Sequence, residues 1–325
     1  MAIRKLSPAL QAIAEKELNE TPERIKDDLM YIREWLRKQP HLKVRTDDQT
    51  LITFLRGCKF SLQRTQEKLD YYYTAKTILT EFYSNRDPYD PDIQEVLKLG
   101  PILPLPNTAS ASSPRIMLLN FAALNPDKVS YISFLKVLFM IWDILFQEDD
   151  HFVVAGVEMW SEVKNASMRY AIQLTPTVIK KTNAVMEKGY PLRMKKHHCT
   201  HCPPIAVGVF NLSKSFVSDK LSKRIFLYSE NDMDKFYQQV PKYLQPKDFG
   251  GENGSLKELT GTDMFIAMII ISSHFSEFWK QKVESYRNWF LEDAKYGTRE
   301  ELRVGISKTP ANMFGVEGTF RQLVD

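Results

Sequence analysis

The second half of the chain alternates between short extended runs and longer helical runs. The extended runs lie at residues 115–121, 153–161, 193–201 and 224–229, and the helical ones at 130–147, 167–188 and 232–240. Such alternation favours an α/β domain with a mainly parallel sheet. The run at 205–213 suits either a helix or a strand by its periodicity. We therefore expect a sheet covered by helices over most of residues 91–260.

Residues 1 to about 85 show helical patterns only. Thr21 and Pro22 predict a helix start, and apolar residues at helical spacing continue that helix to a stop at Pro40. Asp47 or Asp48 is placed to cap the next helix, and a third helical pattern follows at 62–82. These patterns predict an all-helical N-terminal module.

A stretch rich in proline separates the two halves. Six prolines lie between Asp87 and Pro114, together with a run of small residues at 108–113. This punctuation is typical of a linker. We therefore place a domain boundary near residue 90, and a second near 260, after which residues 261–325 form a C-terminal helical extension and tail.

The stretch 190–224 combines apolar and cationic patterns. Period-2 alternation puts Tyr190, Leu192 and Met194 on one face of an extended chain and Arg193 and Lys195 on the other. A helical stripe then follows, and after it two cations one helical turn apart; the residues are Ile205, Val209, Leu212, Phe216 and Val217, then Lys220 and Arg224. Apolar surface beside paired cations indicates contact with oily and anionic groups together, as at a membrane.

Composition narrows the classes of function. Lys and Arg number 44 against 40 Asp and Glu, and this small excess gives no argument for a nucleic-acid partner. The longest apolar run, 264–271, is too short to span a bilayer, and the N-terminus lacks a signal-type apolar core. Three cysteines fit a reducing compartment better than a disulfide framework. We expect a cytoplasmic monomer.

One cluster has the composition of a metal or redox site. Cys199, His201 and Cys202 follow His197 and His198, which suits zinc or a dithiol. However, neighbouring residues on a strand point to opposite faces, and no second ligand pair has comparable spacing. We predict no metal site and no cofactor.

Catalytic patterns are missing from the sequence as well. The segment 147–151, QEDDH, could seat a cation or supply a carboxylate base, but a solvated helix end explains it better. There is no Gly-x-Ser-x-Gly elbow, and no Ser or Cys has an identifiable partner histidine. We predict no catalytic residues and no enzymatic activity.

Five motifs in order resemble one family. They are LITFLRGCKFSLQRT at 51–65, LTPTVIKK at 174–181, YPLRMKKHH from Tyr190, LQPKDFGG at 244–251 and FGVEGTFRQLVD from Phe314. Together they resemble the CRAL-TRIO family of lipid-transfer proteins, and most closely its branch of tocopherol-transfer and retinaldehyde-binding proteins. The resemblance covers most of the chain. It implies a mainly parallel sheet flooring an apolar cavity, with a movable helix as the gate.

The resemblance also implies the residues of the site. The gate would span about 203–217, with Ile205, Val209, Leu212 and Phe216; an ordinary core helix is the alternative. A phosphoinositide-binding patch would comprise Arg193, Lys195, Lys220, Arg224 and Lys59, the last beside Cys58, where the family has Arg. The ligand pocket would comprise Val157, Ser161, Val185, Met186, Tyr190, Leu192, Met194 and Val217, although core packing explains each equally well.

Three polar residues fall where the family has apolar or small ones. They are Thr182, His197 and Asp143, and they could meet a hydroxyl, an aldehyde or a headgroup of the ligand. We predict intracellular binding and transfer of a small retinoid-like or tocopherol-like ligand, released at phosphoinositide-containing membranes. The alternatives are a lipid-sensing regulator that recruits a protein partner without net transfer, and an enzyme acting on a lipophilic substrate.

Overall fold

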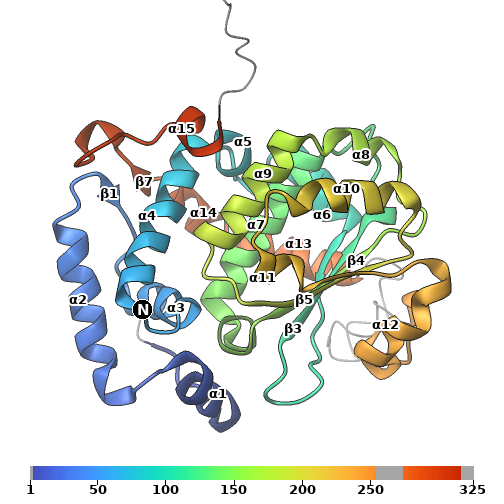
Figure 1. Cartoon of the computed structure of the whole chain (residues 1–325), viewed down its shortest axis with the longest axis horizontal. Helices are drawn as coiled ribbons and strands as arrows, with labels where there is room; N and C mark the ends of the chain where they lie inside the picture. Colours follow the sequence, from blue (N-terminus) through green and yellow to red (C-terminus); the bar gives the residue numbers. More distant parts are fainter. Residues whose placement is uncertain (1–2, 254–273, 316–325) are drawn as a thin grey trace, which may run out of the picture.

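The predicted α/β architecture with a mainly parallel sheet is confirmed. A computed structural model describes residues 3–253 and 274–315, and its main sheet has the strand order β2-β3-β4-β5-β6 (Figure 1). The strands are β2 Ile102–Pro104, β3 Arg115–Asn120, β4 Val157–Glu162, β5 Met194–Thr200 and β6 Ile225–Leu227. Strand β2 pairs antiparallel with β3, and the remaining neighbours pair in parallel.

The connections between the parallel strands put their helices on one face of the sheet. Each crossover leads from one parallel strand to its next neighbour, always in the same direction across the sheet. Right-handed crossovers of this kind all lie on the same side of the sheet. The connecting elements are α7 Tyr131–Glu148, α8 Arg169–Gln173, α9 Pro176–Ala184, the π-helical turn η4 Val185–Gly189, α10 Pro204–Lys214 and α11 Asp219–Ser222. We call this side the inner face.

Helix α12, Met233–Gln239, covers the opposite, outer face. Its Phe236 ring lies with its centroid 5.1 Å from that of Trp160 on β4 and 5.6 Å from that of His198 on β5. Because residues paired across neighbouring strands point to the same side, two rows of side chains line the inner face. One row is Met117, Met159, His197 and Ile225; the next is Leu119, Ser161, Cys199 and Leu227.

The N-terminal region is helical, as predicted, except for the two-residue strand β1 Leu42–Lys43. Its elements are α1 Pro8–Leu18, the 3-10 turn η1 Pro22–Arg24, α2 Ile25–Arg37, α3 Asp48–Gly57, α4 Leu62–Ile78, α5 Thr80–Tyr83 and α6 Pro91–Leu99. Asp47 is the cap of α3, because its carboxylate accepts a hydrogen bond from the Thr50 amide at 3.1 Å. Helix α1 was not predicted.

The proline-rich stretch differs from the linker that we expected. It contains α6, which begins at Pro91 after the Asp90 cap, and the edge strand β2, which ends at Pro104. A proline at the first helical position loses no hydrogen bond, and an edge strand tolerates proline as well. The prolines therefore lie at the ends of a helix and a strand and do not form a free linker. The domain boundaries near residues 90 and 260 stay predictions.

Two elements differ in extent from their predictions. The strand expected at 153–161 begins only at Val157, because residues His151–Ala155 form the π-helical turn η3. The helix expected at 167–188 is divided into α8, α9 and η4, with Thr175 capping α9 and Pro176 at its first position. The ambiguous run at 205–213 is helical, in α10.

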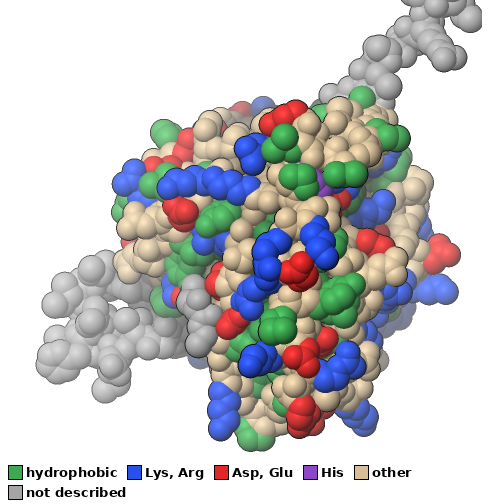
Figure 2. Space-filling model, turned by 90° about the vertical axis from the view of Figure 1, so that its left-hand side faces the viewer, with side chains coloured by type: hydrophobic (Ala, Val, Ile, Leu, Met, Phe, Trp, Pro, Cys, Tyr) green, Lys and Arg blue, Asp and Glu red, His purple; other side chains and the backbone are tan. Residues whose placement is uncertain are grey.

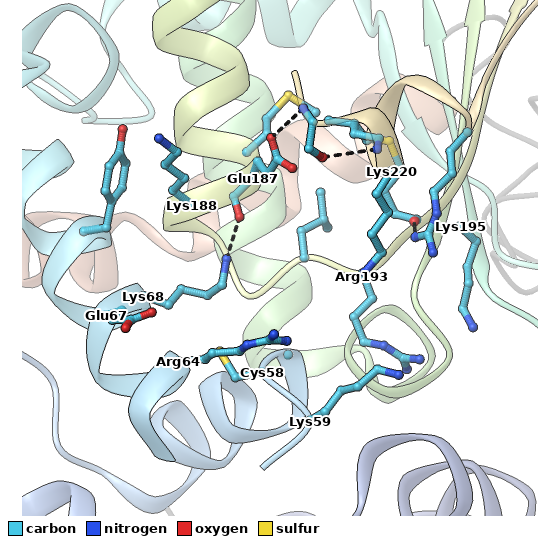
Figure 3. Close-up of a pocket in the computed structure, with 18 of the residues that line it drawn as sticks. Cys58, Lys59, Arg64, Glu67, Lys68, Glu187, Lys188, Arg193, Lys195 and Lys220 are labelled. Carbon is cyan, nitrogen blue, oxygen red and sulfur yellow. Dashed lines mark hydrogen bonds between the residues drawn. The ribbon is translucent and has the colours of Figure 1, made fainter. Parts of the chain in front are cut away.

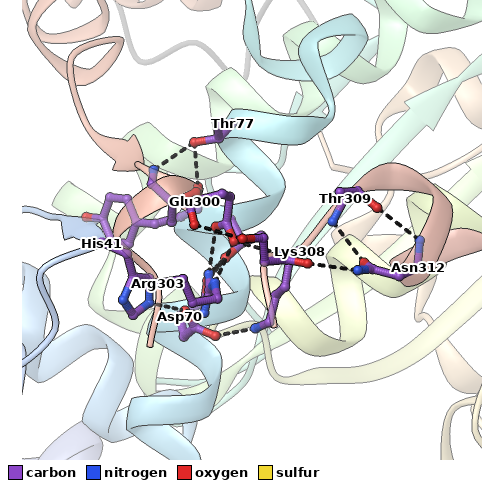
Figure 4. A network of polar contacts seen from close by, with 12 residues as sticks. His41, Asp70, Thr77, Glu300, Arg303, Lys308, Thr309 and Asn312 are labelled. Carbon is purple, nitrogen blue, oxygen red and sulfur yellow. Dashed lines mark hydrogen bonds and ion pairs between the residues drawn. The ribbon is translucent and has the colours of Figure 1, made fainter. Parts of the chain in front are cut away.

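The C-terminal segment folds back onto the N-terminal region. Its elements are α13 His274–Ser285, α14 Arg287–Asp293, the 3-10 turn η9 Glu300–Leu302 and α15 Pro310–Phe314, and strand β7 Gly297–Thr298 pairs with β1 Leu42–Lys43. Asp70 on α4 accepts hydrogen bonds from Arg303 at 2.7 Å and pairs with His41 at 3.0 Å and with Lys308 (Figure 4). The apolar run 264–271 and the tail after Gly315 lie outside the described residues.

Candidate functional site

A pocket lined by basic residues lies between the N-terminal helices and the start of β5 (Figure 3). We call it the cationic pocket; its volume is about 630 Å³. Its basic residues are Lys59, Arg64, Lys68, Lys188, Arg193, Lys195, Lys220 and Arg224, and its acidic residues are Glu17, Glu67 and Glu187. Since basic residues outnumber acidic ones, the pocket is suited to an anion.

The N-terminal wall of the cationic pocket comes from α3 and α4. Ser61 caps α4, and Arg64 and Lys68 follow one helical turn apart, so both side chains point to the same side. Lys59 lies in the turn between the two helices, with a left-handed backbone (φ 54°). These three cations therefore reach the pocket from one direction.

The opposite wall lies close to α3 because two glycines allow it. A Cβ atom on Gly57 would lie 2.5 Å from the Cβ and carbonyl oxygen of Pro191, and one on Gly156 would lie 2.4 Å from the carbonyl oxygen of Arg193. Gly156 also has a positive φ of 96°. The segment leading into β5 can thus bring Arg193 and Lys195 to the pocket.

One carboxylate from α1 neutralises part of this charge. Glu17 Oε2 lies 3.0 Å from Nη2 of Arg193 and 3.1 Å from Nζ of Lys195. The hydrogen bond from Lys195 lowers the pKa of the Glu17 carboxyl, and burial lowers the pKa of Arg193. Glu17 is thus an internal counterion at the edge of the cationic pocket.

Other cations of the pocket have no counterion. Within residues 3–253 and 274–315, the side chains of Lys59, Arg64, Lys188 and Lys220 take part in no ion pair or hydrogen bond. Lys68 donates to the carbonyl oxygens of Glu187 and Tyr190 at 2.8 and 2.9 Å, and burial lowers its pKa. Unpaired like charges around one hollow favour a ligand that bears several negative charges.

All five residues predicted for a phosphoinositide patch line the cationic pocket. Their role stays a prediction. The sequence reasoning missed Arg64, Lys68, Lys188 and Glu17, although the spacing of Arg64 and Lys68 is the same one-turn spacing that singled out Lys220 and Arg224. Three residues predicted for the ligand pocket, Met186, Leu192 and Met194, line this pocket as well.

The other five predicted ligand-pocket residues do not line the cationic pocket. Val157, Val185 and Tyr190 are fully buried, and Val217, just beyond α10, is half-buried. The Tyr190 ring packs in an aromatic core, for example stacked on Phe146 with centroids 5.8 Å apart. Their role in binding a ligand stays a prediction.

Asp143 is not available to a ligand. Its carboxylate pairs with Arg86 Nη1 at 2.7 Å and accepts a hydrogen bond from the Tyr72 hydroxyl at 3.1 Å. The suggestion that it meets a polar group of the ligand is therefore wrong, because the side chain belongs to a buried ion-pair network.

The predicted gate is the helix α10, which packs against α8 and α9. None of its residues is buried, and Ile205 and Leu212 are 45% and 41% exposed. Val209 and Phe216 are half-buried. An apolar helix that buries no side chain is poorly explained as an ordinary core helix.

Strand alternation separates the histidines and cysteines as expected. His197 and Cys199 lie on the inner face, whereas His198 packs on the outer face. In the described part of the chain no three His, Cys, Asp or Glu side chains are placed to hold a metal ion. However, Ser161 Oγ lies 2.9 Å from Nε2 of His197, so the expectation that no serine has a partner histidine is wrong.

Among the described helices, none has both the length and the apolar character needed to cross a bilayer. On the face shown in Figure 2, basic and acidic side chains are interspersed. Mixed charges of this kind are typical of a solvated surface.

Comparison with known proteins gives two domain matches and several relatives. Residues 111–251 match the CRAL/TRIO domain, and residues 21–93 match the UBA domain of Pinta-like proteins. The human "Alpha-tocopherol transfer protein-like" is 27% identical over 263 residues, covering 81% of this chain and 75% of that protein. Clavesin-1 of Rattus norvegicus is 28% identical over 247 residues, covering 76% and 69%. The solved structure "Crystal structure of Sfh5" superposes with a TM-score of 0.44 at 14% identity, covering 86% of this chain and 98% of that one.

Proposed function

Since residues 111–251 of this chain match the CRAL/TRIO domain, we propose that it is a non-enzymatic carrier of a small hydrophobic ligand, released at phosphoinositide-bearing membranes. The name of the human relative, a tocopherol transfer protein-like protein, supports transfer of a lipid rather than its chemical conversion. The ligand is of the retinoid or tocopherol class in size and polarity.

The observation that carries this proposal is the convergence of cations on the cationic pocket. A phosphorylated inositol presents several phosphate groups on one ring, so it needs donors from more than one direction. Arg64 and Lys59 approach from the N-terminal helices, whereas Lys188, Arg193 and Lys220 approach from the α/β domain (Figure 3). A headgroup seated between them would neutralise like charges that otherwise repel one another.

The chain connects this pocket directly to α10. Helix α10 ends at Lys214, and α11, which carries Lys220, leads within a few residues to Arg224 and β6. Binding of a headgroup by Lys220 and Arg224 would therefore act on the short segment that holds the C-terminal end of α10. We infer that this segment couples headgroup binding to displacement of α10.

The ligand itself would lie between α10 and the inner face of the sheet. On β5 and β6, four inner-face residues are half-buried: His197, Cys199, Ile225 and Leu227. Helix α10, above this face, buries none of its side chains. A lipid placed there would cover apolar surface on both the helix and the strands.

Vesicle flotation tests the proposal. The variant Arg64→Gln/Lys220→Gln removes two unpaired cations, while Lys223→Gln removes an exposed cation of the same turn that does not line the pocket. With phosphatidylcholine vesicles containing phosphatidylinositol bisphosphate, we expect the double variant to bind at least about tenfold more weakly, since each charged hydrogen bond contributes about 1.5–3 kcal/mol. Lys223→Gln should bind like the unmodified chain. Equal binding by all three proteins would contradict the proposal.

A further inference from the structure

Three polar side chains meet on the inner face of the sheet. Ser161 Oγ lies 2.9 Å from Nε2 of His197, and Cys199 Sγ lies 3.6 Å from the same nitrogen. We call Ser161, His197 and Cys199 the inner polar cluster.

The cluster lies where the proposed ligand would lie. Ser161 and Cys199 are register partners on β4 and β5, and they point to the face over which α10 crosses from β5 to β6. Around them the two inner rows are otherwise apolar: Met117, Leu119, Met159, Ile225 and Leu227. The cluster is therefore a polar site within an otherwise apolar surface.

This polar site has unused hydrogen-bonding capacity. Nδ1 of His197 has no partner among the described residues, and unlike the ring nitrogens His41 Nδ1 and His198 Nε2 it is not fully enclosed. Outside the cluster, on α9, the Thr182 hydroxyl is also buried and has no partner in the described part of the chain. The Thr182 side chain is only 8% exposed and shares the buried stripe of α9 with Ile179. Polar atoms in such surroundings gain free energy from a partner.

The chemistry of the cluster fits a neutral oxygen group. Burial lowers the pKa of His197 to about 4, so the imidazole is uncharged at neutral pH. The Ser161 hydroxyl can donate to Nε2 or accept from it, so Nδ1 can either donate or accept. An uncharged imidazole offers no ion pair to a carboxylate, whereas it can accept from a hydroxyl or donate to a carbonyl.

The same properties argue against a catalytic serine. A general base works best with a pKa near the operating pH, and one near 4 takes a proton from a serine poorly. Among the described residues no carboxylate is paired with His197 to orient it or to stabilise its charged form. The pair is thus suited to hold a polar group rather than to attack one.

We propose that the inner polar cluster binds the hydroxyl or carbonyl group of the carried lipid and makes this protein selective for neutral, oxygen-bearing lipids. This inference rests on the proposed function, because it requires a lipid beneath α10. It narrows the ligand class: pure hydrocarbons and fatty carboxylates should be rejected, while lipophilic alcohols, aldehydes and ketones should be retained.

A competition experiment on the full chain tests it. Phosphatidylcholine vesicles are loaded with equal amounts of dihydrophytol, phytane and phytanic acid, which share one saturated branched chain and differ only at its end. A second set uses retinol, anhydroretinol and retinoic acid. After gel filtration, the lipids that remain with the protein are extracted and their ratio is measured. This ratio reports only on folded, loaded protein.

We expect the unmodified chain to retain the alcohol over both counterparts by at least about fivefold in at least one set, the factor that one net hydrogen bond provides. An apolar site would instead favour the hydrocarbon, because burying an unpaired hydroxyl costs free energy. His197→Phe should bring the alcohol-to-hydrocarbon ratio to one or below. His198→Phe removes an imidazole from the outer face of the same strand and should leave the ratio unchanged.

The outcomes separate the two proposals. If lipid is retained but neither set shows a preference for the alcohol, or if His197→Phe keeps the original ratio, selectivity by the cluster is wrong while lipid carriage stands. If no lipid of either set remains with the unmodified chain, lipid carriage fails and this inference fails with it.

Discussion

Glu17 and Arg193 form an ion pair, Oε2 to Nη2 at 3.0 Å, although 176 residues separate them in the chain. The same carboxylate oxygen also accepts a hydrogen bond from Lys195 at 3.1 Å. Two residues of the proposed headgroup patch are therefore already engaged by an anion that belongs to the protein. A phosphate that binds them must displace or outcompete Glu17, which makes this carboxylate a competitor of the headgroup.

The first prediction concerns this competition. Glu17→Gln removes the negative charge and should strengthen binding to vesicles containing phosphatidylinositol bisphosphate by about twofold to fivefold, the range of a partly exposed ion pair. Glu15→Gln is the matched control, because Glu15 is an exposed carboxylate on the same helix that does not line the pocket. Flotation at fixed ionic strength measures both. Weaker binding of Glu17→Gln would mean that Glu17 organises the site instead of competing for it.

The second prediction concerns the close approach of α3 to the segment before β5. Gly57→Ala would place a Cβ atom 2.5 Å from both Cβ and the carbonyl oxygen of Pro191. Relieving this overlap should cost about 1–3 kcal/mol in the free energy of unfolding, measured with urea, and should weaken headgroup binding. Gly208→Ala on α10 meets nothing within 4 Å, so it should leave stability unchanged or raise it. Equal stability of Gly57→Ala and the unmodified chain would contradict the packing described for the pocket wall.

The third prediction follows from a buried histidine on the outer face. Burial, and secondarily Lys196, lowers the pKa of His198 to about 4, against an ordinary value near 6.5. Between these values the unfolded chain binds more protons than the folded one, so the free energy of unfolding falls as the pH falls. From pH 7 to pH 5 this residue alone should account for a loss of about 1–2 kcal/mol.

His198→Phe provides the comparison, because its ring would lie among Phe226, Tyr228 and Phe236. We expect urea unfolding of this variant to depend less steeply on pH between 7 and 5. Glu158, which lies 4.0 Å from His198 and whose pKa is raised by burial, is present in both proteins, so its titration contributes to both pH profiles. Parallel pH profiles would show that His198 is protonated in the folded protein.

The fourth prediction concerns the ion-pair network that joins α14 to the N-terminal region. Asp293 pairs with Lys76, with Arg86 at 2.9 Å and with Arg45 at 3.1 Å, and it is almost fully buried. Asp293→Asn leaves the buried Lys76 without its counterion and should cost about 3–5 kcal/mol in the free energy of unfolding. Glu292→Gln, the neighbouring carboxylate on the surface of α14, should change stability little. A small effect of Asp293→Asn in urea unfolding would show that the network relaxes around the loss.

Local patterns in the sequence predicted the elements but not their extent. The strands β3 and β5 and the helix α7 follow from periodicity, and the Asp47 cap follows from residue type, whereas the periodicity of α10 also suited a strand. The division of the predicted helix 167–188 was also signalled, because Thr175 and Pro176 repeat the start signal of Thr21 and Pro22. That signal was overlooked since the apolar spacing continues across the break.

Contacts between distant segments could not be predicted in this way. Periodicity places Arg193 and Lys195 on one side of a strand, but no local pattern indicates that Glu17 lies opposite them. Likewise, the contact of Ser161 with His197 requires the register of β4 on β5, which residue types alone do not specify. The resemblance to a family supplied the grouping of Lys59 with Arg193 and Lys220, which come from separate parts of the chain.

The most direct test of the account is transfer of retinol from donor to acceptor vesicles, with and without phosphatidylinositol bisphosphate in the acceptors. We predict faster transfer to acceptors that contain the phosphoinositide. The variant Arg193→Gln/Lys195→Gln/Lys220→Gln/Arg224→Gln should load retinol normally but lose this acceleration. Equal transfer rates with and without the phosphoinositide, or vesicle binding without any transfer, would contradict the account; the latter would favour a lipid-sensing regulator.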